Sequence, residues 1–234
     1  MTREIVLDTE TTGFEPIPQG TDRIVEIGCV ELQDRVMTGR EFHCYLNPER
    51  AMPEAAFRVH GLSDAFLQDK PGFAAIADAF LDFIGDAPLV IHNAGFDVSF
   101  LNGELEQCQY APIPARRGVD TLAMARRKFP GQSASLDALC SRFAIDLTQR
   151  DKHGALIDAR LLAMVYLELT GGRQVRMALD QAGLSRADLS QGSSYKSEQF
   201  NRPHAPSEAE LIHHRDFLDQ LHNPLWHKYT DGEA

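Results

Sequence analysis

The chain has 234 residues, 43% of them hydrophobic, which is enough for one main domain and a tail. A formal net charge of −11 argues against tight autonomous binding of nucleic acid; with that substrate, metal ions would offset the charge and a partner would supply affinity. No charged leader, no apolar run of roughly 20 residues and no disulfide-type cysteine pattern is present, which predicts a cytoplasmic protein without membrane contacts.

The first half of the chain predicts a mixed sheet. A buried strand is expected at Glu4–Asp8, and two extended runs, Arg23–Leu32 and Gly39–Leu46, are expected as its antiparallel neighbours. The apolar pattern of Phe73–Ile84 predicts a helix leading into a strand at Leu89–Ile91. This helix makes a crossover, so the strand after it should be parallel to the first.

Helices and strands should alternate as far as Leu169. Helical patterns recur at Val98–Leu105, Leu122–Phe129, Leu136–Phe143 and Asp158–Leu169, with a short strand at Gly118–Asp120. Three antiparallel strands followed by alternating helices and strands predict an α/β fold, a mixed five-stranded sheet flanked by helices.

The composition changes after Gly171-Gly172. Ser185–Pro206 is polar and nearly free of aliphatic residues, which predicts a flexible linker. Ser207 and Glu210 then stand at capping-box spacing and predict a short terminal helix, which Asn223-Pro224 should stop. We therefore divide the chain into a main domain, a short segment, a linker and a terminal segment, at 1–172, 173–180, 181–206 and 207–234.

Three segments carry candidate catalytic residues, and the first contains Asp8 and Glu10. The two acids are two positions apart at the end of the first strand, so both side chains should lie on one face of the sheet. An acid at this place can equally be an ordinary strand-end residue. The pair alone therefore leaves both interpretations open.

Asp97 belongs to the second segment, His92 to Asp97, which follows the strand at Leu89–Ile91. It can serve merely as an acid at the start of a helix, where the dipole favours it. The carboxyl ends of parallel neighbouring strands lie side by side, however, which would bring Asp97 towards Asp8 and Glu10. Carboxylates clustered in this way repel one another unless cations hold them.

The third segment is His153 to Asp158. Residues five apart on a helix point about 140° from each other, so we place His153 on a loop at Gly154 and Asp158 on the helix that follows. A lone histidine is usually a surface or core residue, but here it accompanies four acids. Four carboxylates favour two Mg²⁺ or Mn²⁺ ions rather than zinc, with a histidine as general base for an attacking water.

These three segments resemble the motifs of the DEDD exonucleases. Leu7 to Gly13 is similar to the first motif, His92 to Asp97 to the second and His153 to Asp158 to the third. Because histidine precedes the last aspartate by five residues, the histidine branch is indicated. The resemblance implies a ribonuclease H-like fold and a 3′→5′ exonuclease, with Asp8 bridging both ions, Glu10, Asp97 and Asp158 as further ligands, and His153 as the base.

Within this branch the chain is most similar to the proofreading subunits of bacterial DNA polymerase III, the epsilon subunits. The shared features include Val59-His60-Gly61-Leu62 and Asp69-Lys70-Pro71. Segment 174–179 resembles a motif that binds a sliding clamp. The resemblance implies binding to a DNA 3′ end, the polymerase catalytic (alpha) subunit, a clamp and a small accessory subunit, through partner-binding residues Gln174, Met177, Leu179 and Trp226.

The resemblance also implies residues that contact the terminal nucleotide. These are Thr11 near the first motif, and Glu54 and His60 around the Val-His-Gly segment. Glu54 lies six residues before His60, which departs from the family spacing by one. Two alternatives stay open: an RNA 3′-end-trimming exonuclease of the same branch, whose catalytic residues would be the same, and an inactive adaptor between clamp and polymerase, which the complete catalytic set argues against.

Overall fold

The computed structural model describes residues 2–148, 153–171 and 206–220. The chain divides into two compact units, Met1–Met177 and Ala178–Ala234. None of the helices in these described ranges has the length and apolar character needed to cross a membrane.

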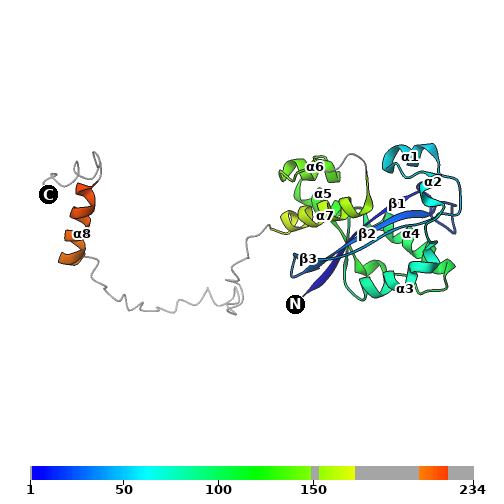
Figure 1. Ribbon diagram of the computed structural model, residues 1–234, viewed down its shortest axis with the longest axis horizontal. Helices are drawn as coiled ribbons and strands as arrows, with labels where there is room; N and C mark the ends of the chain where they lie inside the picture. The colour runs from blue at the N-terminus through cyan, green and yellow to red at the C-terminus, as the bar shows by residue number, and fades with distance from the viewer. Residues whose placement is uncertain (1, 149–152, 172–205, 221–234) are drawn as a thin grey trace, which may run out of the picture. The chain divides into compact units, whose positions relative to one another are not determined.

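The first unit is built on a five-stranded sheet in the order β3-β2-β1-β4-β5 (Figure 1). The strands are β1 (Arg3–Thr11), β2 (Ile24–Gln33), β3 (Val36–Tyr45), β4 (Leu89–Ile91) and β5 (Gly118–Asp120). β1 pairs antiparallel with β2 and parallel with β4, as predicted from the crossover. β3 pairs with β2 rather than with β1, so only one of the two predicted antiparallel neighbours of β1 is an immediate one.

Two strands are longer than the sequence predicted. β1 continues through Thr11, because Glu10 pairs with Glu26 and Thr11 with Ile24 on β2. β3 begins at Val36, because Asp34 and Arg35 both adopt positive φ and close a two-residue hairpin turn. Asp8 and Glu10 therefore lie within β1 and not at its end.

Helices cover both faces of the sheet (Figure 1). In chain order they are α1 (Glu54–His60), α2 (Asp64–Leu67), α3 (Phe73–Ile84), α4 (Ala94–Gln107), α5 (Thr121–Lys128), α6 (Leu136–Arg142) and α7 (Ala155–Leu169), with a 3₁₀ turn, η1 (Ala115–Arg117), before β5. α3 has the bounds predicted from its pattern. α1 and α2 were not predicted, because each is short and buries a single residue, which leaves no apolar stripe in the sequence.

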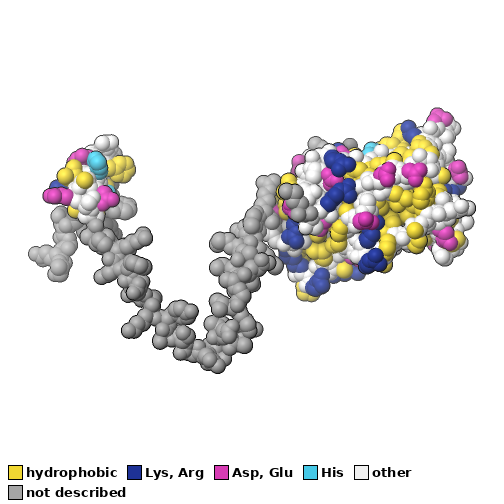
Figure 2. Space-filling view, turned by 90° about the horizontal axis from the view of Figure 1, so that it is seen from below, with side chains coloured by type: hydrophobic (Ala, Val, Ile, Leu, Met, Phe, Trp, Pro, Cys, Tyr) yellow, Lys and Arg dark blue, Asp and Glu magenta, His cyan; other side chains and the backbone are white. Residues whose placement is uncertain are grey.

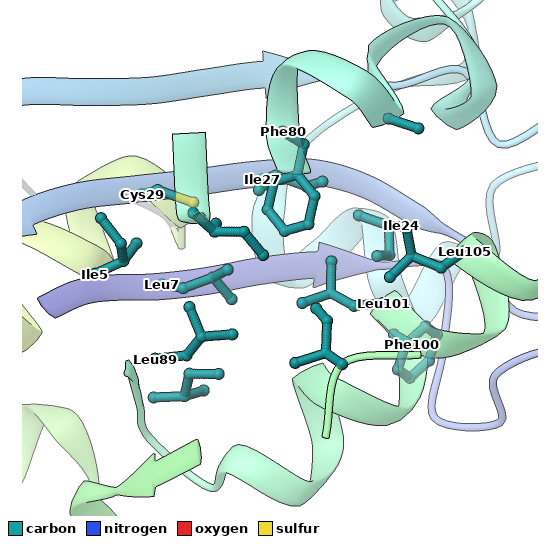
Figure 3. Packing of buried hydrophobic residues seen from close by; sticks show 14 of the residues in the cluster. Ile5, Leu7, Ile24, Ile27, Cys29, Phe80, Leu89, Phe100, Leu101 and Leu105 are labelled. Atoms are coloured by element: carbon teal, nitrogen blue, oxygen red, sulfur yellow. The ribbon is translucent and has the colours of Figure 1, made fainter. Parts of the chain in front are cut away.

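The larger core lies between the sheet and helices α3 and α4. Figure 3 shows Ile5 and Leu7 of β1 in one buried cluster with Phe80 of α3 and Leu101 of α4. Residues of β1 in the alternate positions face the other way, and Val6 packs with Ala159 and Leu162 of α7. The strand period of two therefore puts Asp8 and Glu10 on the α7 side.

Gly28 sets the distance between α7 and the sheet. It lies opposite Asp8 in the pairing of β1 with β2. A Cβ atom at Gly28 would lie 2.3 Å from the carbonyl carbon of Ala155 and 2.3 Å from the nitrogen of Leu156. Only glycine therefore allows the first turn of α7 to pack this closely on β2, beside the acids of β1.

In the second unit the structure describes helix α8 (Glu208–Asp219). The Ser207 hydroxyl accepts a hydrogen bond from the Glu210 amide, and the Glu210 carboxylate accepts one from the Ser207 amide at 2.7 Å. The predicted capping box is confirmed. Large apolar side chains on this helix are exposed, namely Leu211, Ile212 and Phe217.

Candidate active site

Asp97 reaches β1 because β4 is short. β4 ends at Ile91, and α4 begins three residues later, with Asp97 in its first turn. Thr9 donates two hydrogen bonds to Oδ1 of Asp97, one from its amide at 3.1 Å and one from its hydroxyl at 2.7 Å. Asp97 is buried, at 3% exposure. These two bonds hold its carboxylate against the strand that carries Asp8 and Glu10.

The first turn of α7 and the residues just before it provide the third part of the site. Gly154 caps α7, so His153 lies outside the helix and Asp158 lies within its first turn, as predicted. His153 Nδ1 lies 3.3 Å from Asp158 Oδ2, with Asp158 buried and His153 about half exposed. Ligand atoms of Glu10, His153 and Asp158 all lie within 4.8 Å of one another. The structure thus brings together residues from the first and third segments.

The electrostatics of the site follow from burial and from grouping of like charges. Burial raises the pKa of Asp8 well above its usual range, and the neighbouring charges of Asp97, Glu10 and Asp158 raise it further. Burial also raises the pKa of Asp97 to about 7, although hydrogen bonds from Thr9 act in the opposite direction. Both carboxyls therefore resist ionisation in the metal-free protein.

The donor set fits divalent cations with hard-ligand preferences. The residues offer carboxylate oxygens, which Mg²⁺ and Mn²⁺ bind, while no cysteine belongs to the group of three. A bound cation would favour the ionised form of Asp8 and Asp97 and so offset the cost of burying them together. The site is therefore suited to a metal-dependent reaction.

The structure places the three residues expected at the nucleotide in different environments. The Thr11 hydroxyl donates to the Gly13 carbonyl at 2.7 Å, which occupies its proton in the loop after β1. Glu54 begins α1, forms an exposed ion pair with Arg58 and lines a pocket of about 280 Å³. His60 ends α1 and is buried, with Nδ1 accepting from the Leu62 amide.

Three residues around the site were not singled out from the sequence. Thr9 fixes Asp97, Glu26 lies opposite Glu10, and Phe14 is the most exposed large hydrophobic residue of the described chain, at 85%. Phe14 was detectable as an aromatic residue in a polar loop just after the first motif. Thr9 and Glu26 were not detectable from the sequence, because only the structure shows that they lie next to Asp97 and Glu10.

The partner-binding residues expected in the tail are Gln174, Met177, Leu179 and Trp226. All four lie outside the described residues, as do 173–180 and most of the predicted linker, 181–206. These assignments and the domain boundaries stay predictions.

The whole exonuclease unit matches a known family. Residues 5–166 match the family model described as Exonuclease, RNase_T. The chain belongs to this exonuclease family.

Figure 2 shows one face of the protein, on which Lys and Arg side chains lie beside Asp and Glu side chains, without one continuous basic surface.

Similar proteins of known name identify the subfamily within these exonucleases. The chain is 50% identical over 223 residues to DNA polymerase III subunit epsilon of Rickettsia felis, covering 94% of this chain and 96% of that protein. It is 50% identical over 189 residues to the subunit of the same name from Escherichia coli, covering 78% and 77% of the two chains. The chain belongs to the epsilon subunit family, in agreement with the resemblance found in its motifs.

Solved structures agree on the fold. Exonuclease X in complex with 5′-overhanging duplex DNA is 26% identical, with a TM-score of 0.55 over 73% of this chain and 91% of that chain. The nuclease domain of 3′hExo, described as a DEDDh family member bound to rAMP, is 17% identical, with a TM-score of 0.61 over 72% and 91%. The predicted ribonuclease H-like fold is confirmed.

Proposed function

We propose that this chain is the proofreading 3′→5′ exonuclease of a bacterial replicative DNA polymerase and removes mispaired nucleotides from a DNA 3′ end. The observation that carries the proposal is the convergence of ligand atoms of Glu10, His153 and Asp158 within 4.8 Å, in a chain that matches an epsilon subunit over 96% of that protein's length. An adaptor that performs no chemistry would have no need for buried acids at such a cost in repulsion.

We assign two divalent cations, Mg²⁺ or Mn²⁺, to Asp8, Glu10, Asp97 and Asp158. When bound, such ions neutralise charge on the attacking and leaving oxygens of an in-line phosphodiester displacement. Asp97 is prepared for this role because Thr9 occupies its Oδ1, which leaves Oδ2 as the oxygen available to a cation or its water. Asp8 lies among the other three acids, since each of them raises its pKa.

His153 is assigned as the general base. Asp158 Oδ2 is a hydrogen-bond acceptor beside Nδ1, so the neutral imidazole keeps its proton on Nδ1 and has its lone pair on Nε2. Its side chain is 47% exposed, which allows it to return the proton to solvent after each turnover. Histidine is the side chain that most often serves as a general base.

The chemical step is hydrolysis of the terminal phosphodiester. His153 takes a proton from a water molecule as its oxygen forms a bond to phosphorus, and the bond from phosphorus to the 3′ oxygen of the preceding nucleotide breaks. The leaving 3′ oxygen takes up a proton from solvent, so that the products are a 5′-mononucleotide and a strand one nucleotide shorter. Phe14, which is 85% exposed in the loop after Glu10 and Thr11, is assigned to contact with a base by stacking.

We assign the binding of partner proteins to the C-terminal part of the chain. We assign the exposed apolar residues of α8, Leu211, Ile212 and Phe217, together with Trp226, to the polymerase catalytic subunit. Gln174, Met177 and Leu179 are assigned to a sliding clamp. An acidic chain with a net charge of −11 needs such tethers to stay at a primer terminus, because it holds DNA weakly by itself. A small accessory subunit is a further expected partner.

The decisive experiment offers the purified chain a primer with a mismatched 3′ end and Mg²⁺ or Mn²⁺. We expect 5′-mononucleotides released one at a time, and no release with EDTA. An RNA primer of the same sequence tests the RNA-trimming alternative, which would require faster cleavage of RNA than of DNA. Failure to cleave either strand would leave the adaptor alternative.

The tail is tested separately. Truncation after Pro206 should leave cleavage of short single-stranded DNA unchanged and abolish copurification with the polymerase subunit. Replacing Gln174, Met177 and Leu179 with alanine should weaken clamp binding only. A truncated chain that still copurifies with the polymerase, or that loses activity on short DNA, contradicts this division.

A further inference from the structure

Glu26 is a buried acid next to the site that the proposed mechanism does not use. It lies on β2 directly opposite Glu10 in the antiparallel pairing and is 3% exposed. Directly paired residues of neighbouring strands project to the same face of a sheet, so Glu26 and Glu10 both face α7. Glu26 thus adds a fifth carboxylate beside the four assigned to the cations.

The two oxygens of Glu26 have different surroundings. Oε1 lies 2.7 Å from Nε2 of His43 on β3, so the imidazole holds one side of the carboxylate. Oε2 lies beside Gly154, since a methyl group placed there would be 3.9 Å from it. Gly154 separates His153 from the first residue of α7. The second oxygen of Glu26 therefore lies at the turn that carries the proposed base.

We propose that Glu26, oriented by His43, is a positioning residue of the metal site, which strengthens cation binding through its charge without coordinating the ions directly. The inference rests on the proposed function, because it takes Asp8 and Glu10 as cation ligands. It differs from a purely structural role, in which a buried Glu–His pair only stabilises the fold.

The two roles predict opposite effects on stability. The negative charge of Glu26 acts on Asp8 and contributes to raising its pKa, so in the metal-free protein it adds to the repulsion within the site. When cations bind, the same negative charge attracts them. Removing it should therefore weaken cation binding while leaving the metal-free protein as stable as before or more stable.

Glu31 provides a matched control on the same strand. It is a buried glutamate at 4% exposure, but its partners are positively charged arginine side chains. Arg3 Nε lies 2.6 Å and Arg40 Nη1 lies 2.9 Å from its carboxylate. Burial acts to raise the pKa of Glu31, but hydrogen bonds from Arg3 and Thr38 and the charge of Arg40 outweigh it, and the pKa is lowered. Its charge stabilises the fold.

The experiment compares Glu26→Gln and Glu31→Gln by calorimetric titration with Mn²⁺ and by melting of the metal-free protein. For Glu26→Gln we expect Mn²⁺ binding weaker by about tenfold, an unchanged or higher melting temperature, and activity restored towards wild type at saturating Mn²⁺. For Glu31→Gln we expect a lower melting temperature and unchanged Mn²⁺ binding. Glu26→Asp, which keeps the charge, should retain most of the cation affinity.

Unchanged Mn²⁺ binding by Glu26→Gln overturns the proposal, as does a fall in melting temperature as large as that of Glu31→Gln without loss of cation affinity. The titration is independent of catalysis. A wild-type chain that binds Mn²⁺ but releases no nucleotide would therefore contradict the proposed function and leave the role of Glu26 to be decided by the binding data.

Discussion

Buried acids occur in two kinds of environment in this protein. Glu104 on α4 is bound by an arginine fork, with Arg23 Nε and Nη2 each 2.8 Å from a different carboxylate oxygen, and it also accepts the Ile24 amide. The acids of the site instead lie beside other acids, and three of them raise the pKa of Asp8. A charge that supports the fold is matched within the chain, while the charges of the site are those that we propose cations from solution to match.

The largest effect should come from removing a proposed cation ligand. Asp8→Ala or Asp158→Ala should abolish nucleotide release, because the cations lose a ligand, and should leave the fold intact. The metal-free protein should melt at the same or a higher temperature, because repulsion is relieved. The measurement is release from a mismatched primer, with melting curves recorded with and without Mg²⁺. Release at the wild-type rate by either variant would sink the assignment.

His153→Ala should have the next largest effect, slowing turnover by about 10²- to 10⁴-fold because the water loses its base. Cation binding should be largely retained, since the carboxylates remain. Calorimetric titration with Mn²⁺ alongside the rate measurement separates these two expectations. A variant that keeps most of its activity at neutral pH would move the base elsewhere. His92 is the next histidine to test, although burial lowers its pKa and its Nδ1 lies 2.9 Å from the Thr121 hydroxyl.

Glu104→Ala should act on stability rather than on chemistry. It removes the carboxylate that accepts two hydrogen bonds from Arg23, whose side chain is only 17% exposed, and we expect a loss of about 3 kcal/mol in the free energy of unfolding. Urea unfolding measures this loss, and Mn²⁺ titration at a temperature where the variant is folded should give wild-type affinity. Weaker cation binding without loss of stability would show that the two kinds of acid are not distinct.

The smallest effect concerns pH and the metal-free protein. The pKa of Asp97 is about 7 in the folded chain against an ordinary value of 3.8, so between these two values the folded state binds more protons than the unfolded state. The free energy of unfolding should therefore fall as pH rises from about 4 to about 7. Asp97→Asn should reduce this decline. Melting curves of the two proteins across this pH window, in EDTA, provide the test.

Added Mg²⁺ supplies the control for the pH experiment. Cations that bind only the folded state should raise the melting temperature of wild type most strongly at the upper end of the window. A wild-type protein whose metal-free stability rises from pH 4 to pH 7 would show that internally matched acids such as Glu104 dominate the pH dependence.

The sequence alone determined much of the layout. Apolar runs and the 3.6-residue pattern located β4 and α3 at their observed bounds, and Ser207 with Glu210 located the start of α8, because these signals depend only on neighbouring residues. The motifs also singled out the candidate acids and the candidate histidine, whose catalytic roles stay predictions. Short exposed helices such as α1 escaped, since they carry no apolar stripe to detect.

Tertiary structure decided how those residues meet. Thr9 could be assigned to Asp97 only once β4 was seen to end at Ile91 and α4 to begin beside β1. The roles of Gly28 and Glu26 depend on the pairing register of β1 with β2 and on the close packing of α7. Register and packing join residues distant in sequence, and no local pattern records them. The sequence therefore predicts the candidate catalytic residues. The residues that position them can be identified only from the tertiary structure.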